Sequence, residues 1–255
     1  MRRLMMLLCV LTACGLVGCS MGPSASEVYQ MEVGGPLEID VQNFRGDVIL
    51  KADPRRDIAE VKMVRRGEHG FDRGDEARAS LASIDTSVSL VPGELGQRLQ
   101  IRTNTTHVEP NFQSVDIHID VPEIDGVRIL TDDGDVVAIR AEGEVDIQTS
   151  NGNVQVKTRV PMTKPVTIIN NGGGIAYLTR SESTARFDAK VVNGSIYHHV
   201  NRGDLRIFSD TNDESFQAQL NNGANSVILR TVDGPIRIEV VAQPEMVYSR
   251  LLYDS

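Results

Sequence analysis

The densest group of chemically capable side chains in this sequence is the acidic turn Asp132-Asp133-Gly134-Asp135. Carboxylate oxygens are the ligands that calcium prefers, so three of them within four residues make calcium a candidate ligand. The spacing fits neither an EF-hand loop nor the nonapeptide calcium repeat, whose glycines and aspartates recur at fixed positions. We therefore interpret these acids as solvated turn residues and leave calcium binding as the open alternative.

The histidines and a run of glycines are the next candidates. His198 and His199 are adjacent in an apolar alternating segment, and neighbouring residues of a strand point to opposite faces, so they cannot both bind one ion. His69, His107 and His118 lack the spacing of a zinc site. Residues 172–174 are three glycines without the Lys-Ser/Thr pair and helix of a phosphate loop, and they indicate a bulged turn. We expect no metal and no cofactor.

No nucleophile motif for hydrolysis is present, since the chain lacks a G-x-S-x-G elbow and a zincin motif. We therefore assign no catalytic residue. One enzymatic alternative stays open: a polysaccharide lyase or hydrolase that arranges acids on a β-helix face, for which Asp135, Asp146 and Asp188 are the candidates. The chain has no Trp and five Tyr, whereas sugar clefts use aromatic contact, so composition favours a binding module.

These candidates lie on a repeated phrase, a Gly- or Asn-containing turn followed by a strand with apolar residues at every second position. It recurs from Asp125 to Val240, for example as NGNVQVKT at 151–158 and DGPIRIEV at 233–240. The short period, doubled to about twenty residues for two strands, predicts an all-β chain that stacks as a β-solenoid or β-helix. The helix formers of DEARASLAS predict one short helix at 75–83.

The turns contain residue types that tolerate positive φ, as tight turns between strands require. In-register stacking would align three asparagines of these turns in a ladder at one corner, each bonding to the backbone of a neighbouring unit. We assign structural turn roles to Gly46, Gly134, Asn151, Gly152, Asn171, Gly172, Asn193, Gly194 and Gly234, the ladder being formed by Asn151, Asn171 and Asn193.

The N-terminus has the features of an export signal. Two arginines precede an apolar stretch, Leu4 to Val17, that is too short to span a bilayer stably. Leu16-Val17-Gly18-Cys19 resembles a bacterial lipobox, which predicts lipidation at Cys19; Cys14 follows a similar box, and an ordinary cleaved signal is the other alternative. With Cys9, these are the only cysteines, so a mature domain that begins at Cys19 has no disulfide.

We divide the chain into five segments on this basis. They are a lipoprotein signal peptide (1–19), a flexible tether (20–28), an N-terminal β-region with a helical insertion (29–122), a β-strand repeat region continuous with it (123–243), and a C-terminal cap or tail (244–255).

The order of these features is similar to that of a known family. Four features follow one another: a strand with the Arg45-Gly46-Asp47 turn, a helix-bearing insertion, a strand ending in IDVP at 119–122, and serial G-[DN]-[VIL] repeats. In this order they resemble a bacterial adhesin-like repeat domain of unknown function, which is related to an auto-transporter adhesin head domain. The resemblance covers most of residues 35–241. It implies an exported or membrane-anchored protein with a β-helix-like stack, and it implies no catalytic residues.

The formal net charge of −9 disfavours nucleic acid and anionic lipid surfaces as partners. Together these features predict a bacterial cell-envelope lipoprotein, anchored to the membrane by an N-terminal lipid and facing away from the cytoplasm, at the outer membrane or the periplasmic face. Its repeat domain is expected to act as a non-catalytic binding or scaffolding module. The expected partner is an envelope protein or a glycan.

Overall fold

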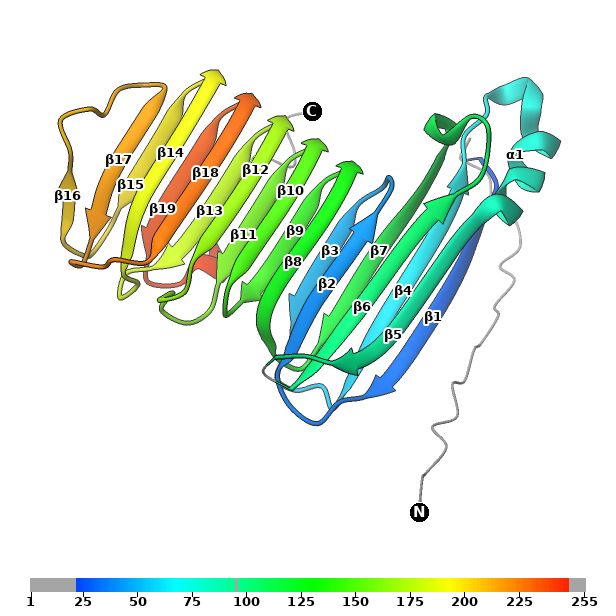
Figure 1. Ribbon diagram of the computed structural model, residues 1–255, viewed down its shortest axis with the longest axis horizontal. Coiled ribbons are helices and arrows are strands. Elements are labelled where there is room, and N and C mark those ends of the chain that lie inside the picture. Colours follow the sequence, from blue (N-terminus) through cyan, green and yellow to red (C-terminus); the bar gives the residue numbers. More distant parts are fainter. Residues whose placement is uncertain (1–21, 95, 248–255) are drawn as a thin grey trace.

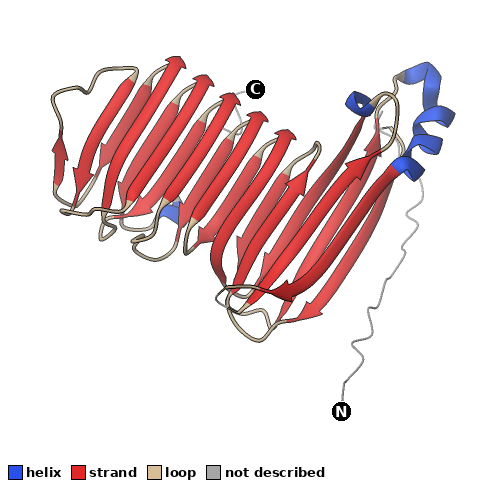
Figure 2. Ribbon diagram, in the orientation of Figure 1, coloured by secondary structure: helices blue, strands red, loops and turns tan. Residues whose placement is uncertain are grey.

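The computed structural model describes residues 22–94 and 96–247 of the 255-residue chain, so the expected signal peptide and the lipidation site Cys19 lie outside the described residues. Within them, two large β-sheets face each other along the length of the molecule, and α1 (Gly74–Ser80) lies at the end that holds the N-terminal strands (Figure 1). Almost all regular structure is strand (Figure 2). The predicted all-β stack with one short helix is confirmed.

The strands of each sheet follow one another in space in an order that differs from their order in the chain. In the described residues the nine-stranded sheet contains β1 (Ser24–Glu32), β4 (Ile58–Gly67), β7 (Gln113–Val121), β3 (Val48–Ala52), β9 (Val136–Ala141), β11 (Val154–Thr158), β13 (Ile175–Arg180), β19 (Ile236–Val241) and β15 (Ile196–Val200). The ten-stranded sheet contains β16 (Leu205–Ile207), β17 (Ser215–Leu220), β14 (Ala185–Asn193), β18 (Ser226–Asp233), β12 (Val166–Gly172), β10 (Val145–Asn151), β8 (Ile124–Asp133), β2 (Leu37–Asn43), β6 (Gln97–Thr105) and β5 (Ile84–Pro92). Short 3-10 segments are η1 (Phe71–Arg73), η2 (Leu81–Ser83), η3 (Pro110–Phe112) and η4 (Pro244–Met246).

The repeating unit is a coil, in which a strand of the ten-stranded sheet turns directly into a strand of the nine-stranded sheet. Neighbouring coils pair in parallel, so equivalent side chains form rows across each sheet; Ile147 of β10 lies between Ile129 of β8 and Ile168 of β12. All three are fully buried between the sheets. Each such side chain contributes roughly 1.5–3 kcal/mol on burial, and stacking makes the core continuous.

The coils do not stack in chain order. The last coil, β18 with β19, lies between the coil of β12 and β13 and the coil of β14 and β15. Near the other end, the first coil, β2 with β3, is flanked by β6 and β8 in one sheet and by β7 and β9 in the other. Both chain ends therefore insert strands between coils that are distant from them in sequence.

A stack of glycines forms the corner between the two sheets. At Gly152, φ is +103°, and an added Cβ would lie 2.3 Å from the carbonyl oxygen of Gly134. At Gly134 the same atom would lie 2.3 Å from the carbonyl oxygen of Gly46. Gly46 and Gly234 also have positive φ, whereas Gly194 does not, although its Cβ would meet Gly234. Glycine at this corner lets neighbouring coils approach backbone to backbone.

In the coil of β12 and β13, Gly173 lies at this corner instead of the expected Gly172. Gly173 has a φ of +119°, and its Cβ would lie 2.2 Å from the carbonyl oxygen of Gly152. Gly172 is the last residue of β12, pairs with Asn151, and does not have positive φ. The turn therefore starts one residue later than the Asn-Gly pair indicates.

A polar ladder does run along this corner, but with other members than the expected asparagines. Its side chains belong to residues that follow the corner glycines: Asp47 Oδ1 accepts the backbone N–H of Asp135 at 2.9 Å, and Asp135 Oδ1 accepts that of Asn153 at 2.7 Å. Asn153 in turn accepts the N–H of Gly174 at 2.9 Å. Each carboxylate or amide thus satisfies a backbone donor of the adjacent coil.

The expected ladder of Asn151, Asn171 and Asn193 does not form. Asn151 and Asn193 are in equivalent positions of their strands, but Gly172 and Asp233 stand between them, and Asn171 is displaced by one residue from this row. Asn193 donates to Asp233 Oδ1 at 2.7 Å. The two coils have the same length between the paired residues Val145 and Val166 and the paired residues Val154 and Ile175, so Asn171 stands opposite Ser150 rather than opposite Asn151.

The N-terminal end of the described chain differs from the expected division. Ser24–Glu32 form β1, which pairs antiparallel with β4 from Ser24 to Glu32, so the tether expected at 20–28 is wrong from residue 24 onward. At the other end, η4 packs against β11, β13 and β19, and Lys157 Nζ donates to the carbonyl oxygen of Val247 at 2.8 Å.

Candidate functional site

The outer face of the ten-stranded sheet contains a groove of about 430 Å³ near the turn edge. Its floor is a row of outward side chains across four neighbouring strands: Gln42 of β2, Leu130 of β8, Gln148 of β10 and Ile169 of β12. Ile169 is 38% exposed. With strands about 4.8 Å apart, the row spans about 14 Å. Amide groups alternating with aliphatic side chains suit an extended partner that lies across the strands.

One end of the groove is held by a buried hydrogen-bond network. Thr103 Oγ1 lies 2.6 Å from Asn43 Oδ1, and Asn43 Nδ2 donates to the carbonyl oxygens of Gly46 at 3.0 Å and Val115 at 2.9 Å. Thr103 also accepts the backbone N–H of Phe44 at 3.2 Å. Because these groups satisfy one another, the turn beside the groove is fixed before any partner arrives.

The three acids considered for polysaccharide cleavage are separated and engaged. Asp135 serves the corner ladder described above. Asp188 accepts a 2.6 Å bond from Arg230, and Asp146 lies 4.0 Å from Arg128. Asp146 and Asp188 share one outward row but β12 and β18 lie between them, a spacing of about 14 Å. Paired carboxylates in glycosidases lie about 5–9.5 Å apart.

The acidic turn also divides its side chains among structural contacts. Asp133 pairs with Arg45 at 2.9 Å, Asp135 belongs to the ladder, and Asp132 faces the groove. In the adjacent coil, burial raises the pKa of Asp47, and the charges of Asp116 and Asp135 add to this effect, while the N–H that it accepts from Asp135 opposes it. The turn acids therefore do not converge on one point.

The two adjacent histidines point in different directions, as strand geometry requires. His198 stacks on Phe216, with ring centroids 4.6 Å apart. His199 is exposed on β15, the edge strand of the nine-stranded sheet. The structure does not bring the pair together.

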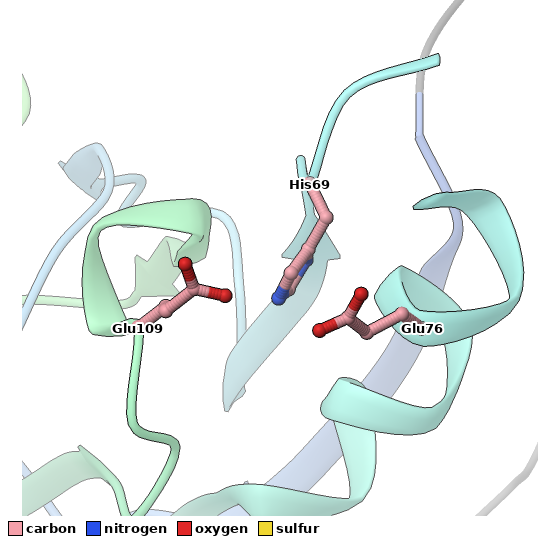
Figure 3. Close-up of side chains that lie close together, drawn as sticks. All are labelled: His69, Glu76 and Glu109. Atoms are coloured by element: carbon pink, nitrogen blue, oxygen red, sulfur yellow. The ribbon is translucent and has the colours of Figure 1, made fainter. Parts of the chain in front are cut away.

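A cluster that sequence spacing did not indicate lies beside α1. His69 follows β4, Glu76 is in α1 and Glu109 precedes η3, and their potential ligand atoms all lie within 4.8 Å of one another. Figure 3 shows the His69 ring between the two carboxyl groups. Arg73 donates to both carboxylates, including two 2.6 Å bonds to Glu76. These bonds lower the pKa of Glu76 and of Glu109.

Comparison with known proteins agrees with this architecture. The family model described as Toastrack DUF4097 matches residues 36–239, from the residue before β2 to a residue within β19. The chain belongs to this Toastrack family. No curated protein matches the Toastrack chain.

Solved structures share the fold at low sequence identity. A candidate cell adhesion protein from Clostridium sporogenes ATCC 15579 is 11% identical, with a TM-score of 0.53, and the match covers 87% of the Toastrack chain and 100% of the other. A candidate adhesin from Bacteroides fragilis NCTC 9343 is 12% identical, with a TM-score of 0.28 and coverage of 85% and 96%. At 11% identity, the similarity to the Clostridium structure shows the fold alone. None of the helices in the described part of the Toastrack chain has the length and apolarity needed to cross a membrane.

Proposed function

We propose that this Toastrack protein is a lipid-anchored protein of the bacterial envelope whose domain binds a partner through the groove of the ten-stranded sheet, without catalysing a reaction on it. The partner is an envelope protein or a glycan. The lipobox-like segment that ends at Cys19 supports the anchor, and the name of the Clostridium cell adhesion protein supports an adhesive role.

The observation that carries the proposal is the row of Gln42, Leu130, Gln148 and Ile169, which offers hydrogen-bonding and apolar contacts at regular spacing. Parallel coils hold these side chains on rigid strands, so little conformational entropy is lost when a partner binds. An extended peptide or glycan fits such a surface, because it makes many similar contacts along its length.

The enzymatic alternative has weaker support. Its three candidate acids serve the corner ladder or pair with arginines, and the two on the sheet face are separated by two strands. A retaining or inverting hydrolase needs two carboxyl groups that approach the same bond. Binding therefore explains the geometry with fewer assumptions.

The groove can be tested by site-specific photocrosslinking in cells that express the full-length protein. A photoreactive amino acid at position 148 lies in the groove, and one at position 190 is a matched control. Lys190 is exposed on the same face and in the same row, but three strands away. We expect a discrete adduct from position 148 and none from position 190.

Two apolar-to-acidic substitutions extend this test. Ile169→Glu places a charge in the groove, whereas Val192→Glu places one on β14 of the same face, where Val192 is 61% exposed. The adduct from position 148 should be lost with Ile169→Glu and kept with Val192→Glu. Equal adducts from both photoreactive positions, or an adduct that is insensitive to Ile169→Glu, would contradict the assignment of the groove.

A further inference from the structure

We propose that His69, Glu76 and Glu109 form a binding site for a divalent transition-metal cation of the zinc type. The site lies at the α1 end of the molecule (Figure 1), and its three side chains, drawn in Figure 3, do not line the groove. It is independent of the function proposed above.

His69 supplies the first observation. His69 is 4% exposed as a residue, and both ring nitrogens are buried without a hydrogen-bond partner in the part of the chain that the structure describes. An unsatisfied buried polar group is costly, and native proteins contain few of them. A metal bound to one ring nitrogen would satisfy it, because neutral imidazole is a strong ligand for zinc, copper, nickel and iron.

The two carboxylates supply the second observation. Figure 3 shows Glu76 and Glu109 approaching the His69 ring from opposite sides, on separate segments of the chain. Zinc bonds of about 2.1 Å in a tetrahedral arrangement place ligand atoms about 3.4 Å apart. The three candidate ligand atoms lie within 4.8 Å of one another, so side-chain rotation of the partly exposed glutamates suffices to close the site. Two carboxylates and a neutral imidazole balance a charge of +2.

Arg73 and the cation would compete for the two carboxylates. Arg73 donates to both oxygens of Glu76 and to Oε2 of Glu109, so one guanidinium bridges the two carboxylates. Arg73 is therefore a competitor of the metal, and its removal should increase the metal affinity.

A fourth ligand of the zinc ion would be a water molecule or, after a side-chain movement, the neighbouring His107. The His107 ring centroid is 5.0 Å from that of His69, and its Nδ1 accepts the backbone N–H of Glu109 at 3.1 Å. This bond leaves Nε2 of His107 for a metal ligand or for a bound water. Catalytic zinc sites keep three protein ligands and one open position, whereas structural sites are closed by four.

The proposal is tested by titrating the full-length protein with ZnCl₂ at pH 7 and measuring heat, with CoCl₂ absorption as a report on the ligands. The wild type should bind one ion. His69→Ala should abolish binding, Glu109→Gln should weaken it at least 10-fold, and Arg73→Gln should strengthen it. The matched control is His198→Ala with His199→Ala, which removes two exposed histidines on the opposite end and should leave the affinity unchanged.

Two results would overturn the proposal. The first is a wild-type protein that binds no zinc in this titration; the second is binding that survives His69→Ala at wild-type affinity. Circular dichroism of the metal-free variants shows whether each is folded. If His69→Ala is unfolded, the comparison of Glu109→Gln with Arg73→Gln decides, because these substitutions at partly exposed positions must change the affinity in opposite directions.

Discussion

Gly152→Val places a β-branched side chain at the corner where two coils meet backbone to backbone. Its Cβ would lie 2.3 Å from the carbonyl oxygen and 2.5 Å from the carbonyl carbon of Gly134, at a φ of +103°. An ordinary contact needs more than 3.4 Å, so the coils must separate by about 1 Å or the turn must change its backbone conformation. No side chain can rotate away to relieve this contact, since both obstructing atoms belong to the backbone.

The cost can be estimated from what the shift breaks. A non-glycine residue held at this φ costs about 1–3 kcal/mol. The separation also strains two hydrogen bonds between the coils, from Asn153 N to Asp135 Oδ1 at 2.7 Å and from Val136 N to the carbonyl oxygen of Asn153 at 2.8 Å, at about 1 kcal/mol each. We therefore expect a loss of about 3–5 kcal/mol, or a fall in melting temperature of roughly 6–20 °C.

The assay is thermal unfolding followed by circular dichroism, with Gly34→Val as the control. Gly34 lies outside the corner, has no positive φ, and meets only the Gln97 side chain, at 3.8 Å. The control should stay within about 0.5 kcal/mol of the wild type. A Gly152→Val protein that melts with the control would refute the close backbone stacking at the corner.

Three further predictions concern the same corner and the anchor. Gly194→Val tests steric contact without positive φ, so it should destabilise the fold less than Gly152→Val in the same assay; an equal loss would show that φ strain is not part of the cost. Asp47→Asn should raise the melting temperature at pH 7, because burial and the nearby charges of Asp116 and Asp135 raise the pKa of Asp47. A raised pKa means that the folded state loses stability as the pH rises above the unfolded value of about 3.8, so the benefit should vanish below pH 4, and a benefit that persists there would contradict this cause. Labelling with a palmitate analogue should mark the wild type and miss Cys19→Ala, and retained label would move the lipid to another residue.

The repeat and the helix could be predicted from the sequence because both depend on local patterns. Alternating residues such as Val145 and Ile147 specify one buried face, and the helix formers after Gly74 specify α1 and the 3-10 turn that follows it. Positive φ at Gly134 and Gly152 follows from turn chemistry in the same way.

The order of the coils could not be predicted. Every coil offers the same backbone hydrogen bonds and a similar apolar row to its neighbours, so the alternation in β18 and β19 does not encode which coil they join. The expected members of the ladder are wrong for a related reason. Asn and Asp tolerate turns on either side of a glycine, and only the register shows that Asn153, rather than Asn171, bonds to the next coil.

The cluster around His69 could not be found from sequence spacing because Glu109 is 33 residues from Glu76 in the chain, and because His69 and Glu109 lie in loops. β4 and β7 pair antiparallel, with Gly67 opposite Gln113, so the segment after β4 and the segment before β7 meet at one end of the sheet. His69 and Glu109 are in these two segments. A signal existed in principle, since long-range strand pairing would have placed them together.

The Toastrack domain, as proposed, binds a partner and leaves it chemically intact. This property can be measured as the release of soluble products from bacterial and plant polysaccharides by the purified full-length protein, compared with Asp146→Asn. We predict no product above background from either protein. Cleavage by the wild type that disappears in Asp146→Asn would contradict a purely binding role and establish the outer face of the ten-stranded sheet as an active site.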